Sequence, residues 1–109
     1  GPALAPDEAA LLERYRAMLS LAKRPAFAEG GTWDLVYCNG DMPRFDPDRH
    51  FAFVRYTEQE AWLVACNFSD RPAALRIRLP RELRDRCPRL PEIASAYVKP
   101  WDARLLRIR

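Results

Sequence analysis

The chain has 109 residues, of which 18 are basic and 15 are acidic, so its formal net charge is +3. This length suits one domain, or one domain with a flanking helix, and a hydrophobic fraction of 49% argues against a disordered chain. No apolar run approaches the roughly 20 residues that cross a membrane, and the near balance of charge makes a nucleic-acid partner unexpected. We expect residues 1–2, Gly-Pro, to be an expression scar outside the fold.

Residues 3–24 are expected to carry an amphipathic helix. From Pro6 to Lys23 the apolar residues recur at the spacing of one helical face. Asp7 and Glu8 suit the positive N-terminal end of a helix, and Pro25 ends it. The apolar positions of this face are Leu11, Leu12, Tyr15, Met18, Leu19 and Ala22.

A β-hairpin is the clearest prediction in the next part of the chain. Thr32–Cys38 is rich in β-branched and aromatic residues and is typical of a strand, whereas Asn39–Arg49 carries a glycine and two prolines and is typical of a loop. The apolar runs Phe51–Tyr56 and Ala61–Cys66 flank a polar turn at Thr57–Glu60. Successive apolar residues in both runs predict strands that are apolar on both faces.

Polar side chains at the ends of this hairpin are expected to have structural roles. The hairpin is followed by Asn67-Phe68-Ser69-Asp70, which is turn chemistry. Asn67 can tie that turn through its side chain, and Arg55 can pair with a nearby carboxylate.

Three shorter elements and a final strand are predicted after the hairpin. Ala74–Leu79 alternates apolar and basic residues, which indicates one buried and one solvated face. Arg81–Asp85 fits a single helical turn, and Ile93–Val98 and Ala103–Arg109 fit strands. Short strands separated by turn signals favour an antiparallel β-sandwich over residues 25–109.

Several short motifs follow one another in an informative order. Tyr15–Leu21 gives a Tyr-Arg-x-x-Leu-x-Leu helix pattern, and it is followed by Arg24-Pro25-Ala26-Phe27, by a strand ending in Asn67-Phe68-Ser69, and by Pro100-Trp101 before the last strand. This order resembles the C-terminal β-domain that follows the catalytic barrel in the α-amylase family of glycoside hydrolases. The resemblance extends over nearly everything from Pro6 onward.

The resemblance implies a mainly β fold: an antiparallel β-sandwich of the α-amylase C-terminal-domain type, preceded by one N-terminal amphipathic helix. It also implies a non-catalytic accessory domain that stabilises the catalytic barrel of an enzyme acting on α-linked glucans. The barrel of the parent chain is then the expected partner, and an excised domain is expected to self-associate through the exposed helix. The barrel-facing residues would be Leu11, Leu12, Tyr15, Met18 and Leu19.

No residue of this chain inherits a catalytic role from the resemblance. Retaining glycosidases use two carboxylates about 5 Å apart, and in this family they lie on loops of the barrel. None of those motifs is present here, and no cofactor is implied.

A second hypothesis is a stand-alone glycan-binding module, in which aromatic rings stack on glucose units. Trp33 and Trp62 lie in strand-like runs, where aromatic side chains usually fill the core. Trp101 lies beside a proline in a loop and is the best candidate for binding carbohydrate; Tyr37 is a further aromatic residue of this kind.

Other constellations favour plain structural roles. Asp41, Asp46 and Asp48 share a loop and could hold calcium, but turn and capping roles fit them better, so we expect no metal site. His50 and Ser69 could join Asp48 in a catalytic triad, but nothing in the sequence brings the three together.

Cysteine and arginine usage is also weakly informative. Cys38, Cys66 and Cys87 lack metal-finger spacing, and the first two are expected to be buried thiols in strands. Unpaired cysteines slightly favour a cytoplasmic over a periplasmic location.

Six arginines form a basic stripe that could bind phosphates. Acidic residues interrupt this stripe, so a solvated, ion-paired surface is expected. The stripe comprises Arg76, Arg78, Arg81, Arg84, Arg86 and Arg89.

Overall fold

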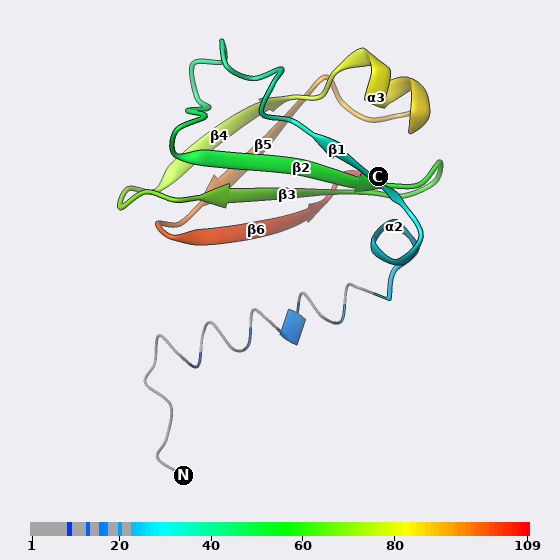
Figure 1. Cartoon of the computed structure of the whole chain (residues 1–109), viewed down its shortest axis with the longest axis horizontal. Coiled ribbons are helices and arrows are strands. Elements are labelled where there is room, and N and C mark those ends of the chain that lie inside the picture. Colours follow the sequence, from blue (N-terminus) through cyan, green and yellow to red (C-terminus); the bar gives the residue numbers. More distant parts are fainter. Residues whose placement is uncertain (1–8, 10–12, 14–15, 18–19, 21–22) are drawn as a thin grey trace.

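The computed structural model describes residues 9, 13, 16–17, 20 and 23–109, and this part of the protein is mainly β. In the continuous described segment from residue 23 to 109, six strands form two antiparallel sheets, with two short helices beside them (Figure 1). The four-stranded sheet has the order β1-β2-β3-β6, with β1 at Gly31–Asp34, β2 at His50–Tyr56, β3 at Ala61–Asn67 and β6 at Asp102–Arg107. The two-stranded sheet pairs β4 (Ala73–Arg78) with β5 (Ile93–Val98), and the helices are α2 (Pro25–Ala28) and α3 (Arg81–Arg86).

The predicted helix over residues 3–24 falls largely outside the described residues. Seven of its positions are described: Lys23 and Arg24 lie in a turn and a bend, and the other five are helical and exposed, namely Ala9, Glu13, Arg16, Ala17 and Ser20. Among the described residues, no helix is both long and apolar enough to cross a membrane.

The predicted hairpin is confirmed as β2 and β3, which pair from Tyr56 opposite Ala61 to His50 opposite Asn67. Its turn is held by Thr57, whose Oγ1 accepts hydrogen bonds from the backbone N–H groups of Gln59 and Glu60 at 3.2 and 3.1 Å. A threonine hydroxyl that accepts from the backbone in this way stabilises a tight turn.

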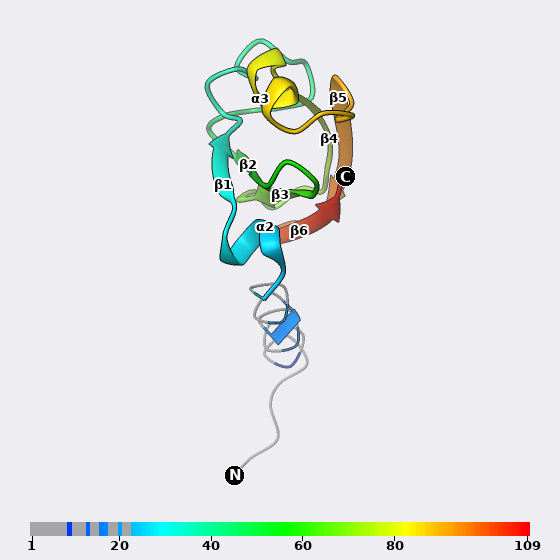
Figure 2. The same cartoon turned by 90° about the vertical axis from the view of Figure 1, so that its right-hand side faces the viewer.

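The core lies between the two sheets, and α3 packs over it (Figure 2). β4 has the predicted alternation, with Leu75 and Ile77 buried and their basic neighbours exposed. α3 confirms the predicted helical turn and contributes Leu83, which has no exposed surface. The remaining core side chains of the sheets include Ala52, Val54, Leu63, Ala65, Ala94, Ala96 and Val98.

The first predicted strand is shorter than expected. β1 ends at Asp34 because the carboxylate of Asp34 accepts a hydrogen bond from the backbone N–H of Val36 at 3.1 Å, which turns the chain. Cys38 therefore lies in the following loop and not in a strand. The last strand also ends early, at Arg107, and the N–H groups of Ile108 and Arg109 both donate to the Ala61 carbonyl.

Gly30 lies at a close approach of two backbone segments. A Cβ at this position would lie 2.3 Å from the Ala26 carbonyl oxygen and 2.4 Å from that of Tyr56. Only glycine lets the segment after α2 pass this close to the end of β2.

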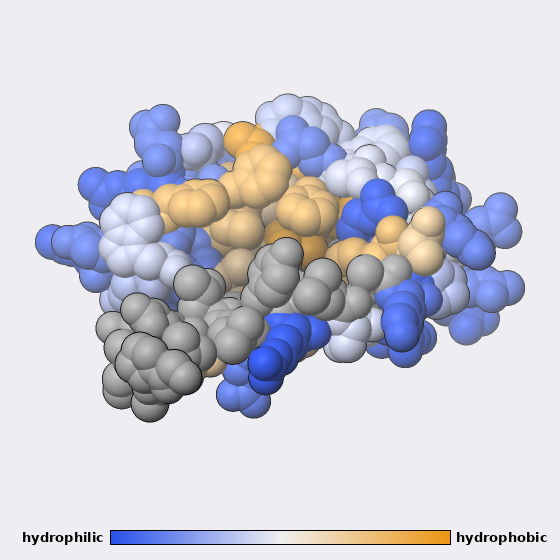
Figure 3. All heavy atoms as spheres, turned by 60° about the horizontal axis from the view of Figure 1, so that its bottom comes forward, coloured by the Kyte–Doolittle hydropathy of each residue, from blue (hydrophilic) through white to orange (hydrophobic). Residues whose placement is uncertain are grey.

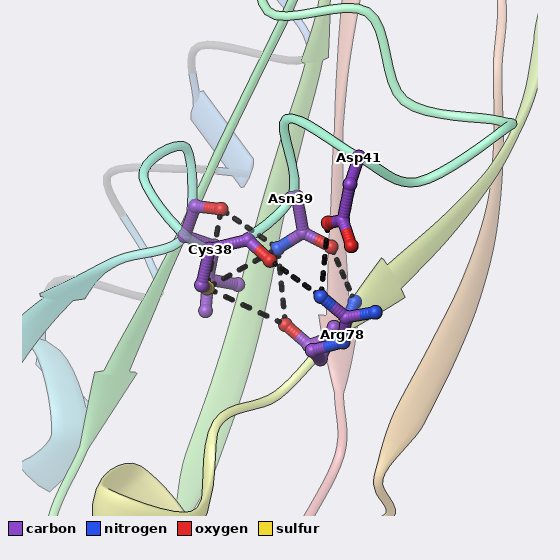
Figure 4. A network of polar contacts seen from close by, with 5 residues as sticks. Cys38, Asn39, Asp41 and Arg78 are labelled. Carbon is purple, nitrogen blue, oxygen red and sulfur yellow. Dashed lines mark hydrogen bonds and ion pairs between the residues drawn. The ribbon is translucent and has the colours of Figure 1, made fainter.

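Two buried asparagines join the sheets at opposite ends. Asn39 accepts a hydrogen bond from the Arg78 N–H at 2.6 Å and donates to the Arg78 carbonyl at 3.1 Å, so its side chain pairs with the edge of β4 as a neighbouring strand would (Figure 4). Asn67 confirms the predicted turn role, because its amide oxygen accepts from the N–H and hydroxyl of Ser69. It also donates to the Val98 carbonyl at 3.2 Å, at the end of β5.

Replacing Asn39 with alanine should lower the free energy of unfolding by about 2–3 kcal/mol, because buried backbone groups of Arg78 and Leu35 lose their partners. Urea denaturation at neutral pH measures this. Asp41→Ala is the control, since Asp41 pairs with the Arg78 side chain at 3.0 Å but lies in solvent; it should hardly move the midpoint. Equal midpoints for the two variants would contradict the role given to Asn39.

Candidate functional site

Part of the outer face of the four-stranded sheet is apolar, in a block that crosses β2, β3 and β6. The β2–β3 register places Phe51 opposite Cys66 and Phe53 opposite Val64, and the β3–β6 register continues these rows to Ala103 and Leu105. An antiparallel sheet with one solvated face normally carries polar residues at such positions. We call this set of six side chains the outer patch: Phe51, Phe53, Val64, Cys66, Ala103 and Leu105.

The outer patch forms a continuous apolar surface. Phe51 is 40% exposed, and its ring centroid lies 5.7 Å from that of Phe53. Val64 is buried although it does not belong to the core between the sheets. Figure 3 shows apolar side chains gathered across this side of the molecule, with charged side chains around them. A surface of this kind marks a site of interaction with another apolar surface.

The chain enters the β-domain beside this patch, at a junction that is fixed by the buried carboxylate of Glu60. Glu60 accepts hydrogen bonds from Arg24 Nε at 2.5 Å and from Trp62 Nε1 at 2.7 Å. The Arg24 guanidinium also lies 5.6 Å from the centre of the Trp62 ring, and Phe27 packs against that ring at 6.2 Å. The Arg24-Pro25-Ala26-Phe27 segment is therefore held tightly against β3.

The electrostatics of this junction favour the ionised carboxylate. Burial by itself raises the pKa of Glu60, but the hydrogen bonds from Trp62 and Arg24, the Arg24 charge and the backbone N–H of Ala26 lower it. The net result is a pKa below the ordinary value of the group. Glu60 is thus a structural anion.

Arg55 is the second anchor of the junction, and among the described residues it has neutral oxygen partners and not the predicted carboxylate. Its guanidinium donates to the Phe27 carbonyl at 2.7 Å and to the Thr32 hydroxyl. Arg55 joins α2, β1 and β2 through neutral oxygens, which the sequence did not indicate because Phe27 lies 28 residues away.

The predicted barrel-facing residues Leu11, Leu12, Tyr15, Met18 and Leu19 lie outside the described residues. Their described neighbour Ala17 lines a pocket of about 390 Å³ together with Ala103 and Leu105. Position 17 therefore lies beside β6, at the part of the outer patch that Ala103 and Leu105 form.

Trp101, the predicted carbohydrate-binding residue, is 69% exposed in the turn between β5 and β6. It has a positive φ of 54°, and its N–H donates to the Ser69 carbonyl at 3.2 Å. No ring contact to another described aromatic residue is present, so Trp101 presents a single ring to solvent.

The other aromatic candidates are engaged with neighbouring side chains. Trp33 is partly buried, donates from Nε1 to the Tyr37 hydroxyl at 3.0 Å, and has the Arg86 guanidinium 5.2 Å from its ring centre. Trp62 carries Arg24 in a similar position. An arginine over each indole occupies a face on which a sugar would have to stack.

The remaining candidates form hydrogen bonds that hold turns. Asp46 accepts the N–H of Asp48 at 3.0 Å, as in a turn, and among the described residues no group of three possible metal ligands comes together. His50 Nδ1 accepts the N–H of Asp46 at 2.9 Å. Ser69 donates its hydroxyl to Asn67 at 2.8 Å, and so it is not a partner of His50.

The three cysteines are free thiols, and the prediction that Cys38 and Cys66 are buried in strands needs correction. Only Cys66 lies in a strand, and both are half-buried, whereas Cys87 is fully buried. Burial raises the pKa of the Cys38 thiol and of the Cys66 thiol, so neither is an activated nucleophile.

Part of the arginine stripe is neutralised. Arg78 pairs with Asp41 at 3.0 Å and Arg84 lies 3.9 Å from Glu92, whereas Arg76, Arg81 and Arg89 have no ion pair within the described part of the chain.

Comparison with known proteins finds no match to this chain among protein-family models, curated proteins or solved structures. A functional proposal therefore depends on the residues and their arrangement.

Glu60→Gln should lower the free energy of unfolding at pH 7 by about 1–3 kcal/mol, because the charge-assisted bonds from Arg24 and Trp62 are weakened. Since the pKa of Glu60 is lower in the folded protein than its ordinary value of 4.5, its contribution is present above that pH and is lost as the pH falls through the folded pKa. The free energies of unfolding of the variant and the parent, measured by urea denaturation, should therefore be closer to one another at pH 3 than at pH 7.

Glu58→Gln makes the same change at an exposed carboxyl group two residues earlier and should unfold as the parent does. A Glu60→Gln variant as stable as the parent at pH 7 would contradict the anchoring role.

Proposed function

We propose that this chain is a non-catalytic accessory domain of an α-amylase-type glycoside hydrolase, with a β-sandwich of the C-terminal-domain type, and that it stabilises the catalytic barrel of its parent protein. The observation that carries the proposal is the outer patch, because a two-layered domain has no use for apolar side chains on the outside of a sheet unless another surface covers them.

The junction supports the same proposal. Glu60 and Arg55 hold the segment Arg24–Phe27 at the edge of the outer patch. A helix that precedes this segment would thus reach the β-domain at a fixed point and at the side where the outer patch lies. Rigid attachment of this kind suits a domain whose task is to pack against its neighbour and not to move freely on a linker.

The chemistry of the described residues also fits a scaffold. The buried polar side chains Asn39, Glu60, Asn67 and Ser69 all have hydrogen-bond partners within the fold. None of them is left to act on a substrate. These groups hold loops and sheets together.

If the outer patch is a docking surface, the isolated chain should self-associate through it at high concentration. Phe51→Ser should weaken this association about tenfold or more, because truncating a buried aromatic side chain at an interface costs over about 1.4 kcal/mol. Sedimentation velocity over a concentration series measures the effect.

Ile93→Ser is the matched control, since Ile93 is 39% exposed, close to the 40% of Phe51, but lies on the two-stranded sheet. A strictly monomeric parent, or equal effects of the two substitutions, would count against the outer patch as an interface.

A stand-alone glycan-binding module is the second candidate, and the exposure of Trp101 favours it. Calorimetric titration with maltoheptaose separates the two. The scaffold proposal predicts no heat, because Trp101 offers a single ring without a flanking aromatic partner. Millimolar or tighter binding that is lost in Trp101→Ala would make the domain a glycan-binding module and would assign its site.

A further inference from the structure

A basic pocket lies between the 43–46 loop and the beginnings of β2 and β4. It has a volume of about 390 Å³. Phe45 and Leu75 contribute buried apolar surface to its lining, and His50 lies beside them. The long loop before β2 and the turn after β3 meet here, because the register places His50 opposite Asn67 and thus close to Ser69.

Positive charge exceeds negative charge in this lining. Three arginines, Arg44, Arg49 and Arg71, line the pocket with a single carboxylate, Asp46. Asp46 lies 3.7 Å from the Arg49 guanidinium, whereas Arg44 and Arg71 have no ion pair within the described residues. A concave surface with unpaired guanidinium groups attracts anions.

The backbones that carry the unpaired arginines are fixed. The Arg44 carbonyl accepts the N–H of Arg76 in β4 at 3.4 Å. The Arg71 carbonyl accepts from the side chains of Asn67 and Ser69 at 2.7 and 3.0 Å. Both side chains therefore start from defined positions at the pocket, and less conformational freedom is lost when they bind a ligand.

His50 adds a hydrogen-bond donor. Its Nδ1 accepts the backbone N–H of Asp46 at 2.9 Å, so the neutral ring carries its proton on Nε2. The ring is held against Phe45, with centroids 5.8 Å apart. An imidazole N–H beside guanidinium groups suits an oxyanion.

We propose that this pocket binds a phosphate dianion, either free or as a monoester, through Arg44, Arg49 and Arg71 with His50 as a further donor. Guanidinium groups match the geometry of phosphate oxygens and form short, charge-assisted hydrogen bonds with them. The volume suits a small anion. The site is separate from the outer patch, so phosphate binding can be tested independently of the proposed scaffold role.

His50 is the only histidine of the chain, and its ring resonances in NMR therefore report on the pocket without ambiguity. In the free protein burial lowers the pKa of His50, Asp46 raises it and Arg49 lowers it; Arg44 and Arg71 are the other charged groups at the pocket. A bound dianion adds negative charge and should raise the pKa of His50.

The experiment titrates the whole chain with inorganic phosphate at constant ionic strength, and follows the His50 ring and the backbone amides. We expect saturable shifts at His50, Ser69 and Arg71 and a higher pKa for His50. Arg71→Gln and Arg44→Gln should each weaken binding about tenfold. Arg81→Gln, which removes the same charge from an exposed residue of α3 outside the pocket, should leave binding unchanged.

A parallel titration with glucose 6-phosphate distinguishes the two sources of the anion. Equal or tighter binding than inorganic phosphate assigns the pocket to phosphate monoesters, and binding of inorganic phosphate alone assigns it to the free ion. The proposal would be overturned if sodium chloride reproduced the shifts. It would also be overturned if Arg71→Gln and Arg81→Gln bound phosphate with equal affinity while their amide spectra elsewhere were unchanged.

Discussion

The structure depends on a hairpin that is apolar on both faces. The inner side chains of β2 and β3, such as Val54 and Leu63, form the core with the two-stranded sheet. The outer ones, such as Phe51 and Phe53, lie on the opposite face of the same strands, over which the described residues form no second sheet. Burial of exposed apolar surface on this face would add roughly 25 cal/mol per Å², and this is the gain that the proposed docking would provide.

Polar side chains and loop carbonyls supply hydrogen bonds that a neighbouring strand would otherwise provide. Among the described residues the second sheet has two strands, so backbone groups along the free edge of β4 would lack partners. Asn39 supplies both a donor and an acceptor to Arg78, and the carbonyl of Arg44 accepts from Arg76. The long loop thus acts as a substitute edge strand, which also protects β4 from pairing with another chain. Glu60 likewise fixes the N-terminal junction, because its carboxylate accepts a hydrogen bond from Arg24.

Local patterns predicted much of the fold and little of the candidate sites. The hairpin, α3 and the alternation in β4 follow from turn chemistry and periodicity within a few residues. The pairing of Asn39 with Arg78 and of Arg24 with Glu60 joins residues 39 and 36 positions apart, and no local signal indicates such partners. The predicted two-faced hairpin pointed to the outer patch, but its extension to Leu105 required the register of β6. The pocket at His50 likewise exists only where two distant loops meet.

Cys66 offers a direct test of the central proposal, because this free thiol belongs to the outer patch. Its alkylation rate can be compared with that of Cys38, in the 109-residue chain alone and in the longer, barrel-containing protein that the proposed function implies. If a catalytic barrel covers the patch, the rate for Cys66 relative to Cys38 should fall about tenfold or more in that longer protein. An unchanged ratio would contradict the account, since the outer patch would then be as accessible beside a barrel as in the 109-residue chain alone.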